Sequence, residues 1–132
     1  MEIEVKLNVI KMNQKIKNQS EKKVIIKGSC GSHCIDAGQI THLTCMGYKT
    51  SFHLKDNAKL ISHSKLLKKW EAELSDFGFL RVSKNTIINL IFLIYIESKE
   101  RKVKLSSGEV INVSHEGLKL LNNIFKKTKN KP

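Results

Sequence analysis

The stretch FLRVSKNTIIN, residues 79–89, is the most informative part of this 132-residue chain. It contains a short, mainly apolar run at 79–82 and three polar residues at 83–85. A longer apolar run begins at residue 86 and continues beyond this stretch to residue 97. Short apolar runs bounded by turn-forming residues are typical of β-strands. We therefore expect a strand, a tight turn and a core strand, in which Asn89 makes structural hydrogen bonds.

A second pair of strands is expected at residues 102–105 and 109–113. Apolar and polar residues alternate in both runs and Gly108 lies in the loop between them, so the pattern predicts a β-hairpin. Ser114 comes next and is expected to cap a last helix. The apolar residues of that helix fall on one face and are Leu118, Leu121, Ile124 and Phe125.

Short strands also dominate the chain before residue 79. Turn-forming residues recur there at intervals of about 8 to 12 residues, which is typical of an all-β sandwich or barrel. The expected strands are residues 24–26, 33–36, 40–46 and 48–54.

Residues 64–74 have the periodicity of a helix instead. Their apolar residues follow one helix face, so we expect an amphipathic helix of about three turns that packs Trp70 on the sheet. Ser62 or Ser64 is expected to cap its N-terminus. The apolar positions are Leu66, Leu67, Trp70 and Leu74.

These patterns predict one mainly β domain of several small sheets, with one amphipathic helix in mid-chain and one helix at the C-terminus. A chain of this length has room for one compact domain, which excludes a large multi-domain enzyme. Residues 1–22, where Ile3 to Val9 alternate with polar residues, are expected to form an N-terminal arm or ancillary strand. Residues 23–126 are expected to form the domain and residues 127–132 a basic C-terminal tail.

The charge balance favours a polyanionic partner. The chain has 24 Lys and Arg against 12 Asp and Glu, a formal net charge of +12 with neutral histidines. Sequence motifs for nucleophilic, metal-dependent or nucleotide-dependent catalysis are missing, so we expect neither an enzyme nor a cofactor.

The compartment is expected to be the cytoplasm. The N-terminus has no signal-peptide pattern, and the longest apolar run, residues 87–96, is about half as long as a membrane-spanning helix. Three cysteines are an odd number, which fits a reducing compartment better than a disulfide framework. We therefore expect no membrane insertion.

A metal site is an alternative, because five thiol or imidazole groups lie within sixteen residues. However, three of them fall in predicted strands, and His42 and Cys45 are three residues apart, so they point to opposite faces. We expect reduced core cysteines, surface histidines and no metal, with a small zinc protein that uses Cys30, Cys34 and Cys45 as the alternative. The five residues are Cys30, His33, Cys34, His42 and Cys45.

Residues 79–90 and 103–114 together resemble the signature half of the LytTR DNA-binding domain. That family has the pattern F-x-R-[IV]-x-[RK]-S-x-[LIV]-[LIV]-N, an apolar strand, a hairpin V-x-L-x-[ND]-G-x-x-[IL]-x-V-S-[RK] and a closing helix. The earlier strands and the 64–74 helix follow in the family's order, so the resemblance covers about residues 23–126. It implies a bacterial transcription regulator that binds double-stranded DNA sequence-specifically. Loops, not a recognition helix, would enter successive major grooves at two imperfect direct repeats.

Six residues are candidate DNA contacts on this basis. A lysine can donate to guanine O6 and N7 or to a phosphate, and an asparagine can bind adenine N6 and N7 through two hydrogen bonds. Asn85 could instead cap its turn and Tyr48 could instead pack in the core. The candidates are Tyr48, Lys49, Ser83, Lys84, Asn85 and His115.

The sequence departs from the family at three points. His115 stands where the family usually has Arg, which implies weaker contacts that strengthen as the pH falls through the imidazole's range. Ile91 and Phe92 replace polar or basic residues, and they are expected to be buried under the N-terminal arm. A protein-interaction module that uses them as a docking surface is the alternative.

The third departure is the short stretch before residue 23, which has no room for a receiver domain, so we expect a stand-alone DNA-binding domain. Regulation is then expected through a protein regulator, abundance or a second copy bound at an adjacent repeat.

Overall fold

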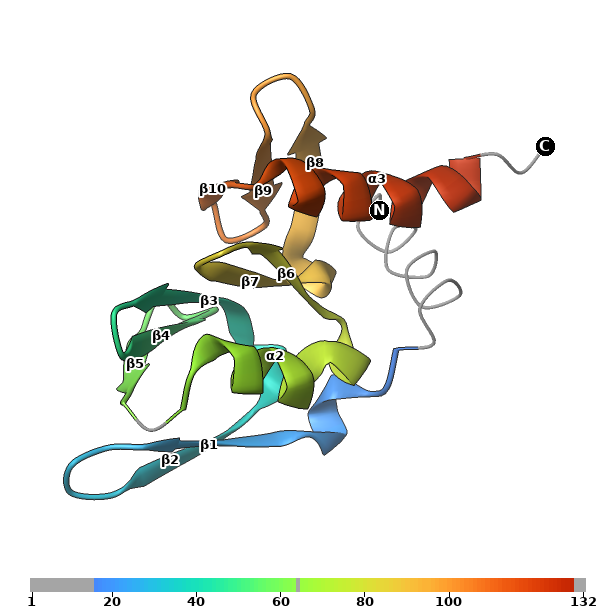
Figure 1. Ribbon diagram of the computed structural model, residues 1–132. Coiled ribbons are helices and arrows are strands. Elements are labelled where there is room, and N and C mark those ends of the chain that lie inside the picture. Colours follow the sequence, from blue (N-terminus) through green and yellow to red (C-terminus); the bar gives the residue numbers. More distant parts are fainter. Residues whose placement is uncertain (1–15, 64, 130–132) are drawn as a thin grey trace.

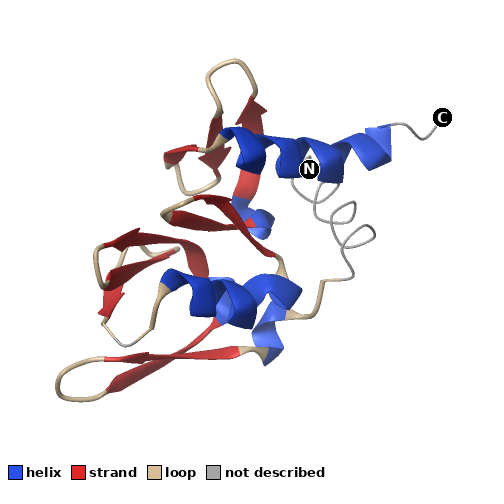
Figure 2. Cartoon of the chain, in the orientation of Figure 1, coloured by secondary structure: helices blue, strands red, loops and turns tan. Residues whose placement is uncertain are grey.

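A five-stranded antiparallel sheet lies at the centre of the protein. The computed structural model describes residues 16–63 and 65–129. The strand order of the central sheet is β5 (Lys59–Ser62), β4 (Lys49–Leu54), β3 (Ile40–Met46), β7 (Thr86–Asn89), β6 (Phe79–Ser83). The two smaller sheets contain β1 (Lys23–Lys27) and β2 (Ser32–Asp36), and β10 (Val110–Asn112), β9 (Lys102–Leu105) and β8 (Leu93–Glu97) (Figures 1 and 2).

Two α-helices pack around these sheets in the part of the chain that the structure describes, α2 (Leu67–Leu74) and α3 (His115–Lys129). Short 3-10 turns, η1 (Gln19–Glu21), η2 (Ala37–Gln39), η3 (Ser75–Phe77) and η4 (Leu90–Phe92), join neighbouring elements. The mainly β class, with one helix in mid-chain and one at the C-terminus, is therefore confirmed.

The central sheet separates two hydrophobic cores. Because successive side chains of a strand point to opposite faces, Ile87 packs with Trp70 of α2, whereas Ile88 packs with Leu121 of α3. Figure 1 shows α2 on one side of the sheet and α3 with the three-stranded sheet on the other. In the α2 core, the edge of the Phe52 ring meets the Trp70 ring with centroids 4.7 Å apart.

The hairpin and the last helix form as expected. β9 and β10 pair in antiparallel register, and the turn between them contains Gly108 in a left-handed conformation. The Ser114 hydroxyl accepts a hydrogen bond from the Gly117 backbone N–H at 2.9 Å, so Ser114 caps α3. Leu121 and Ile124 are buried on the inner face of α3, and the side chain of Phe125 lies outside the described residues.

The start of α2 differs from the expectation. Leu66 takes the N-cap position without a side-chain cap, and its side chain is 59% exposed, so it does not belong to the buried helix face. Ser62 is not the cap, because it lies in β5, paired with Thr50. Ser64, the other expected cap, lies outside the described residues.

The apolar run at 86–97 is not one core strand, which corrects the prediction. It forms β7, then η4, then β8, and the two strands belong to different sheets. The Asn89 side-chain oxygen accepts the Ile91 backbone N–H at 3.1 Å, and its amide donates to the Ile40 carbonyl at 2.8 Å. These bonds turn the chain at the end of β7 and confirm the structural role expected for Asn89.

Residues just before β1 pack against the domain. Gln19 is buried, and its side-chain amide exchanges hydrogen bonds with that of Asn89, at 2.8 and 3.1 Å. Gln19 also donates to the Phe77 carbonyl. The strand expected in residues 3–9 lies outside the described residues.

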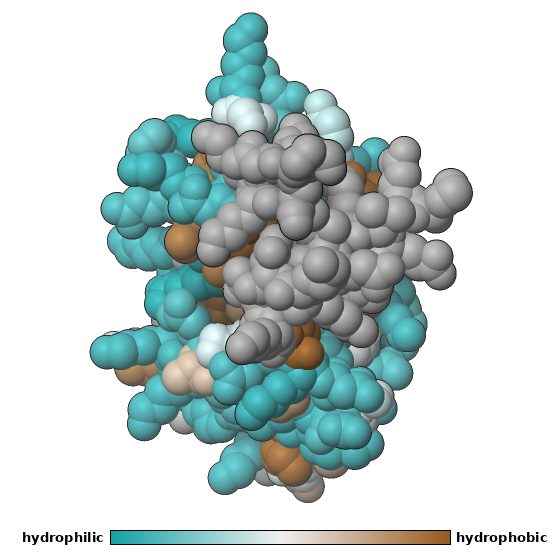
Figure 3. Space-filling model, turned by 90° about the vertical axis from the view of Figure 1, so that its right-hand side faces the viewer, coloured by the Kyte–Doolittle hydropathy of each residue, from teal (hydrophilic) through white to brown (hydrophobic). Residues whose placement is uncertain are grey.

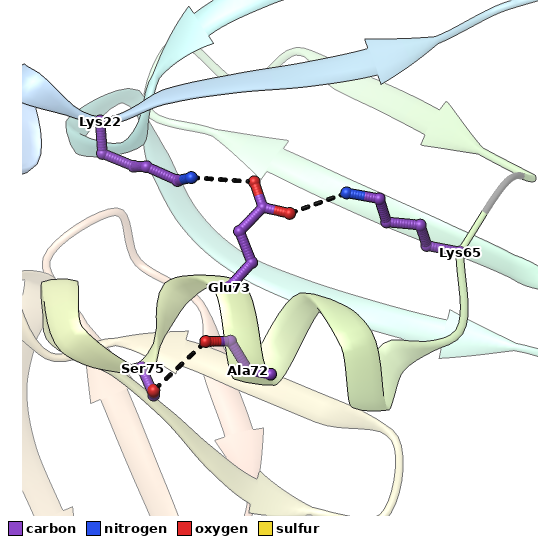
Figure 4. A network of polar contacts seen from close by, with 5 residues as sticks. All are labelled: Lys22, Lys65, Ala72, Glu73 and Ser75. Atoms are coloured by element: carbon purple, nitrogen blue, oxygen red, sulfur yellow. Dashed lines mark hydrogen bonds and ion pairs between the residues drawn. The ribbon is translucent and has the colours of Figure 1, made fainter.

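An ion-pair network ties the same segment to α2 (Figure 4). Glu73 bridges Lys22 at 3.1 Å and Lys65 at 2.8 Å. Burial raises the pKa of Glu73, but hydrogen bonds and charge from the two ammonium groups outweigh it and leave this pKa below its ordinary value. The network therefore stabilises the ionised carboxylate between two segments far apart in the sequence.

Candidate nucleic-acid interface

Two turns lie side by side at one end of the central sheet. The β3–β4 turn contains Gly47 and Tyr48, and the β6–β7 turn contains Lys84 and Asn85. β3 runs antiparallel to both β4 and β7, so the end of β3 and the start of β7 share this end of the sheet. The Cys45 backbone N–H donates to the Asn85 carbonyl at 2.9 Å and joins the two turns.

The β3–β4 turn presents large side chains to solvent. Tyr48 is 84% exposed, so it does not pack in the core, and Lys49 beside it is exposed as well. Gly47 has a φ of 63°, a left-handed conformation that favours glycine. The turn therefore projects a phenol and an ammonium group beyond the end of the sheet.

The β6–β7 turn is held through its backbone. The Arg81 guanidinium donates to the Lys84 carbonyl at 2.7 Å, and the Asn85 carbonyl is bound by Cys45. The side chains of Lys84 and Asn85 are exposed, whereas that of Ser83 is half-buried. An ammonium and an amide are thus presented on a turn whose two carbonyl groups are both hydrogen-bonded.

The N-terminus of α3 lies at the same end of the sheet. β6 has a register irregularity between Arg81 and Ser83, and the Val82 carbonyl within it accepts the Ser114 backbone N–H at 2.8 Å. The Ser114 hydroxyl donates to the same carbonyl at 3.2 Å. His115 follows directly and is exposed, so it lies near the turn that begins two residues after Val82.

The structure therefore brings all the candidate contact residues to one end of the central sheet. The β3–β4 and β6–β7 turns at this end lie on the left in Figure 1. We call this surface the turn end. It consists of Tyr48, Lys49, Ser83, Lys84, Asn85 and His115.

A shallow groove of about 410 Å³ adjoins the turn end. It runs between α2 and α3 along the edge strand β6. Its lining includes Glu71, Arg81, Ser83, Lys84, Glu116 and Leu120.

Arg81 is the residue that the sequence analysis missed at this site. Its guanidinium binds Glu71 of α2 at 3.2 Å and the Lys84 carbonyl of the turn, so it links two elements. The only signal in the sequence is the third position of the F-x-R motif. The ion pair itself depends on how α2 packs on β6, which the sequence does not reveal.

The cysteines and histidines behave only partly as expected: Cys45 packs against the α2 core and His33 is exposed, as predicted. Cys30 and Cys34 are exposed instead of lying in the core, because the β1–β2 hairpin that carries them extends away from the domain (Figure 1). His42 is buried instead of lying on the surface, because its ring stacks on that of His53 with centroids 4.1 Å apart. Burial and, next, the neighbouring His53 lower the pKa of His42 to about 4.

Residues 16–63 and 65–129 contain no group of three or more metal-ligating side chains placed to hold an ion. No helix among them is long and apolar enough to cross a membrane. On the face shown in Figure 3, hydrophilic residues cover most of the surface that is not drawn in grey. Ile91 and Phe92 are half-buried, and Phe92 packs against the α3 core, whereas the arm expected to cover them lies largely outside the described residues.

Comparisons with known proteins agree with this architecture. The family model of the LytTr DNA-binding domain matches residues 31–126. Among solved structures, the chain is similar to the LytTr DNA-binding domain of a putative methyl-accepting/DNA response regulator from Bacillus cereus. The TM-score is 0.68 at 18% identity, over 80% of this chain and 97% of that one. A search of curated proteins gave no significant match.

Proposed function

The chain belongs to the LytTr DNA-binding domain family, and from that membership we propose that the turn end recognises a specific double-stranded DNA sequence. DNA binding and the regulation of transcription are the kind of function that the family carries. The finer proposal is a bacterial, cytoplasmic regulator whose turns enter successive major grooves at two direct repeats. It assigns no catalytic role and needs no cofactor.

The observation that carries the proposal is the clustering of exposed hydrogen-bonding side chains at the turn end. Lys84 and Asn85 lie on a turn joined to the β3–β4 turn by the Cys45–Asn85 hydrogen bond. Lys84 has the chemistry to donate to guanine, and Asn85 to bind the adenine edge. Lys49 and the N-terminus of α3 flank them and are suited to phosphate contacts.

Net charge supports the affinity of this contact. With a formal net charge of +12, the chain gains binding free energy from counterion release, so the affinity falls steeply with rising salt concentration. This contribution does not depend on base sequence. We assign sequence discrimination to the side chains of the turn end.

Selection of bound duplexes from a random pool, with the full chain as bait, tests the proposal. We expect two spaced, similarly oriented half-sites in the enriched sequences. Lys84→Ala should then lower discrimination between the selected duplex and a scrambled one of equal length. An equal loss of affinity for both would make Lys84 a phosphate contact instead.

Direct repeats also imply two bound copies. A second copy at the adjacent half-site is therefore the partner we propose, and binding to a one-half-site duplex measures what that copy contributes. If affinity and stoichiometry are the same for one and two half-sites, the direct-repeat part of the proposal is wrong.

A further inference from the structure

Arg81 joins α2 to the β6–β7 turn. One guanidinium nitrogen lies 3.2 Å from a Glu71 carboxylate oxygen, and the other donates to the Lys84 carbonyl at 2.7 Å. The Arg81 side chain is half-buried on the α2 side of β6. A single planar group therefore connects a packed helix to the backbone of an exposed turn.

The rest of this link is rigid. Glu71 follows Trp70, which is fully buried against Phe52, so the helix that carries the carboxylate is fixed by core packing. On the other side of the turn, the Asn85 carbonyl is held by Cys45 of β3. Arg81 thus anchors one of the two carbonyls of this turn, and β3 anchors the other.

We propose that Arg81, oriented by Glu71, is a positioning residue that fixes the β6–β7 turn in the conformation that presents Lys84 and Asn85 to base edges. The inference rests on the function proposed above. Holding the turn before DNA arrives removes part of the entropy cost of ordering it on binding. Arg81 then contributes to sequence discrimination through the turn and not through a base contact of its own.

Arginine has the geometry for this task, and lysine does not. The guanidinium fork directs separate N–H groups at the carboxylate and the carbonyl, whereas an ammonium is a point charge on a flexible stem. Arg81→Lys therefore keeps the charge but loses the double link. Selected and scrambled duplexes should then bind more similarly.

A direct phosphate contact by Arg81 predicts the opposite result for Glu71. Glu71→Gln removes a negative charge and leaves the guanidinium at most a weaker, uncharged acceptor, so simple electrostatics makes both duplexes bind more tightly. If Arg81 positions the turn, the same change weakens discrimination because the guanidinium loses the ionic part of its anchor. The two explanations are separated by whether discrimination stays the same, as for a phosphate contact, or falls, as for a positioning residue.

Asp76→Asn is the matched control. It removes one negative charge and the ion pair with Lys17. Asp76 lies in η3 just before β6 begins, at the end of that strand opposite to the Lys84 turn. The Asp76→Asn variant should therefore discriminate between the two duplexes as well as the wild type does.

The experiment measures dissociation constants of the full-length variants for the selected duplex and a scrambled duplex of equal length, at two salt concentrations. Discrimination is the dissociation constant for the scrambled duplex divided by that for the selected one. We expect Arg81→Lys and Glu71→Gln each to lower this ratio by about fivefold or more, the scale of one base contact. In a Lys84→Ala background, Arg81→Lys should lower the ratio by less than about twofold further, since both changes act on the same turn. Circular dichroism verifies that each variant is folded. If Arg81→Lys is unfolded, Glu71→Gln, which keeps Arg81, tests whether Arg81 positions the turn.

The inference is wrong, and the proposed function stands, if Lys84→Ala loses discrimination while Arg81→Lys and Glu71→Gln keep it. A Glu71→Gln variant that binds both duplexes more tightly by the same factor, with discrimination unchanged as in Asp76→Asn, also overturns it. If Lys84→Ala and Asn85→Ala both keep full discrimination, the inference and the proposed base-reading role of the turn are both wrong.

Discussion

Gly117 of α3 lies so close to Val82 of β6 that a Cβ atom on Gly117 would be 2.1 Å from the Val82 carbonyl oxygen. This close contact sets how near the first turn of α3 lies to β6 and to the β6–β7 turn. Because Ser114 also binds the Val82 carbonyl, the position of His115 depends on this crossing.

Gly117→Ala should therefore destabilise the protein. In an open helix site, alanine would stabilise by about 1 kcal/mol over glycine, whereas the clash with backbone should cost about 1–3 kcal/mol. Urea unfolding measures the change. Gly31→Ala, where an added Cβ has no neighbour within 4 Å, is the control and should have little effect. A more stable Gly117→Ala would show that α3 does not cross β6 at this distance.

Asn89→Ala should lower the free energy of unfolding by about 2–4 kcal/mol, because it leaves several buried hydrogen-bonding groups without partners. The groups belong to Gln19, Ile40 and Ile91. In a double-mutant cycle, adding Gln19→Ala should cost less in the Asn89→Ala background than in the wild type. Strictly additive losses would mean that the two amides do not interact.

The buried His42 should make stability depend on pH. Its pKa is lowered to about 4 in the folded protein, against an ordinary value of 6.5, so the unfolded chain binds more protons between these values. The contribution of neutral His42 to the free energy of unfolding is fully present above pH 6.5 and is lost as the pH falls through the folded pKa. Urea unfolding between pH 4 and 7 should show a smaller slope for His42→Gln than for the wild type. An imidazole of His42 that titrates near 6.5 by NMR would contradict this.

His115→Arg should tighten DNA binding by about three- to tenfold, because the guanidinium fork makes stronger phosphate and guanine contacts than an imidazole. Asn123→Arg adds the same charge to an exposed position two turns later on α3 and serves as the control. Equal gains for both variants would reduce the effect to net charge.

Local patterns were sufficient to predict much of the fold. The 102–113 hairpin, the Ser114 cap and the β6–β7 turn each depend on residues close in sequence, and the structure confirms them. β5 was not expected, because KLIS is a four-residue edge strand defined only by its pairing with β4. The run at 86–97 was misjudged because hydropathy does not show where a buried asparagine turns the chain.

Ser83, Lys84 and Asn85 come from a turn that the sequence identifies, and sheet register brings that turn beside the β3–β4 turn. The links that hold these turns are between distant residues. Glu71 with Arg81, Cys45 with Asn85 and Ser114 with Val82 join positions brought together only by packing. Exposure of Cys30 and Cys34 and burial of His42 were missed for the same reason, since neither follows from residue type.

The most direct test of the turn end as the DNA-binding surface is an NMR titration of the full-length, ¹⁵N-labelled chain with the selected duplex. We expect the largest amide shift changes in residues 46–49, 83–86 and 114–117, with the β1–β2 hairpin at 23–36 unaffected. Changes that gather on the hairpin or on α2 while the turn end stays unperturbed would contradict the proposal.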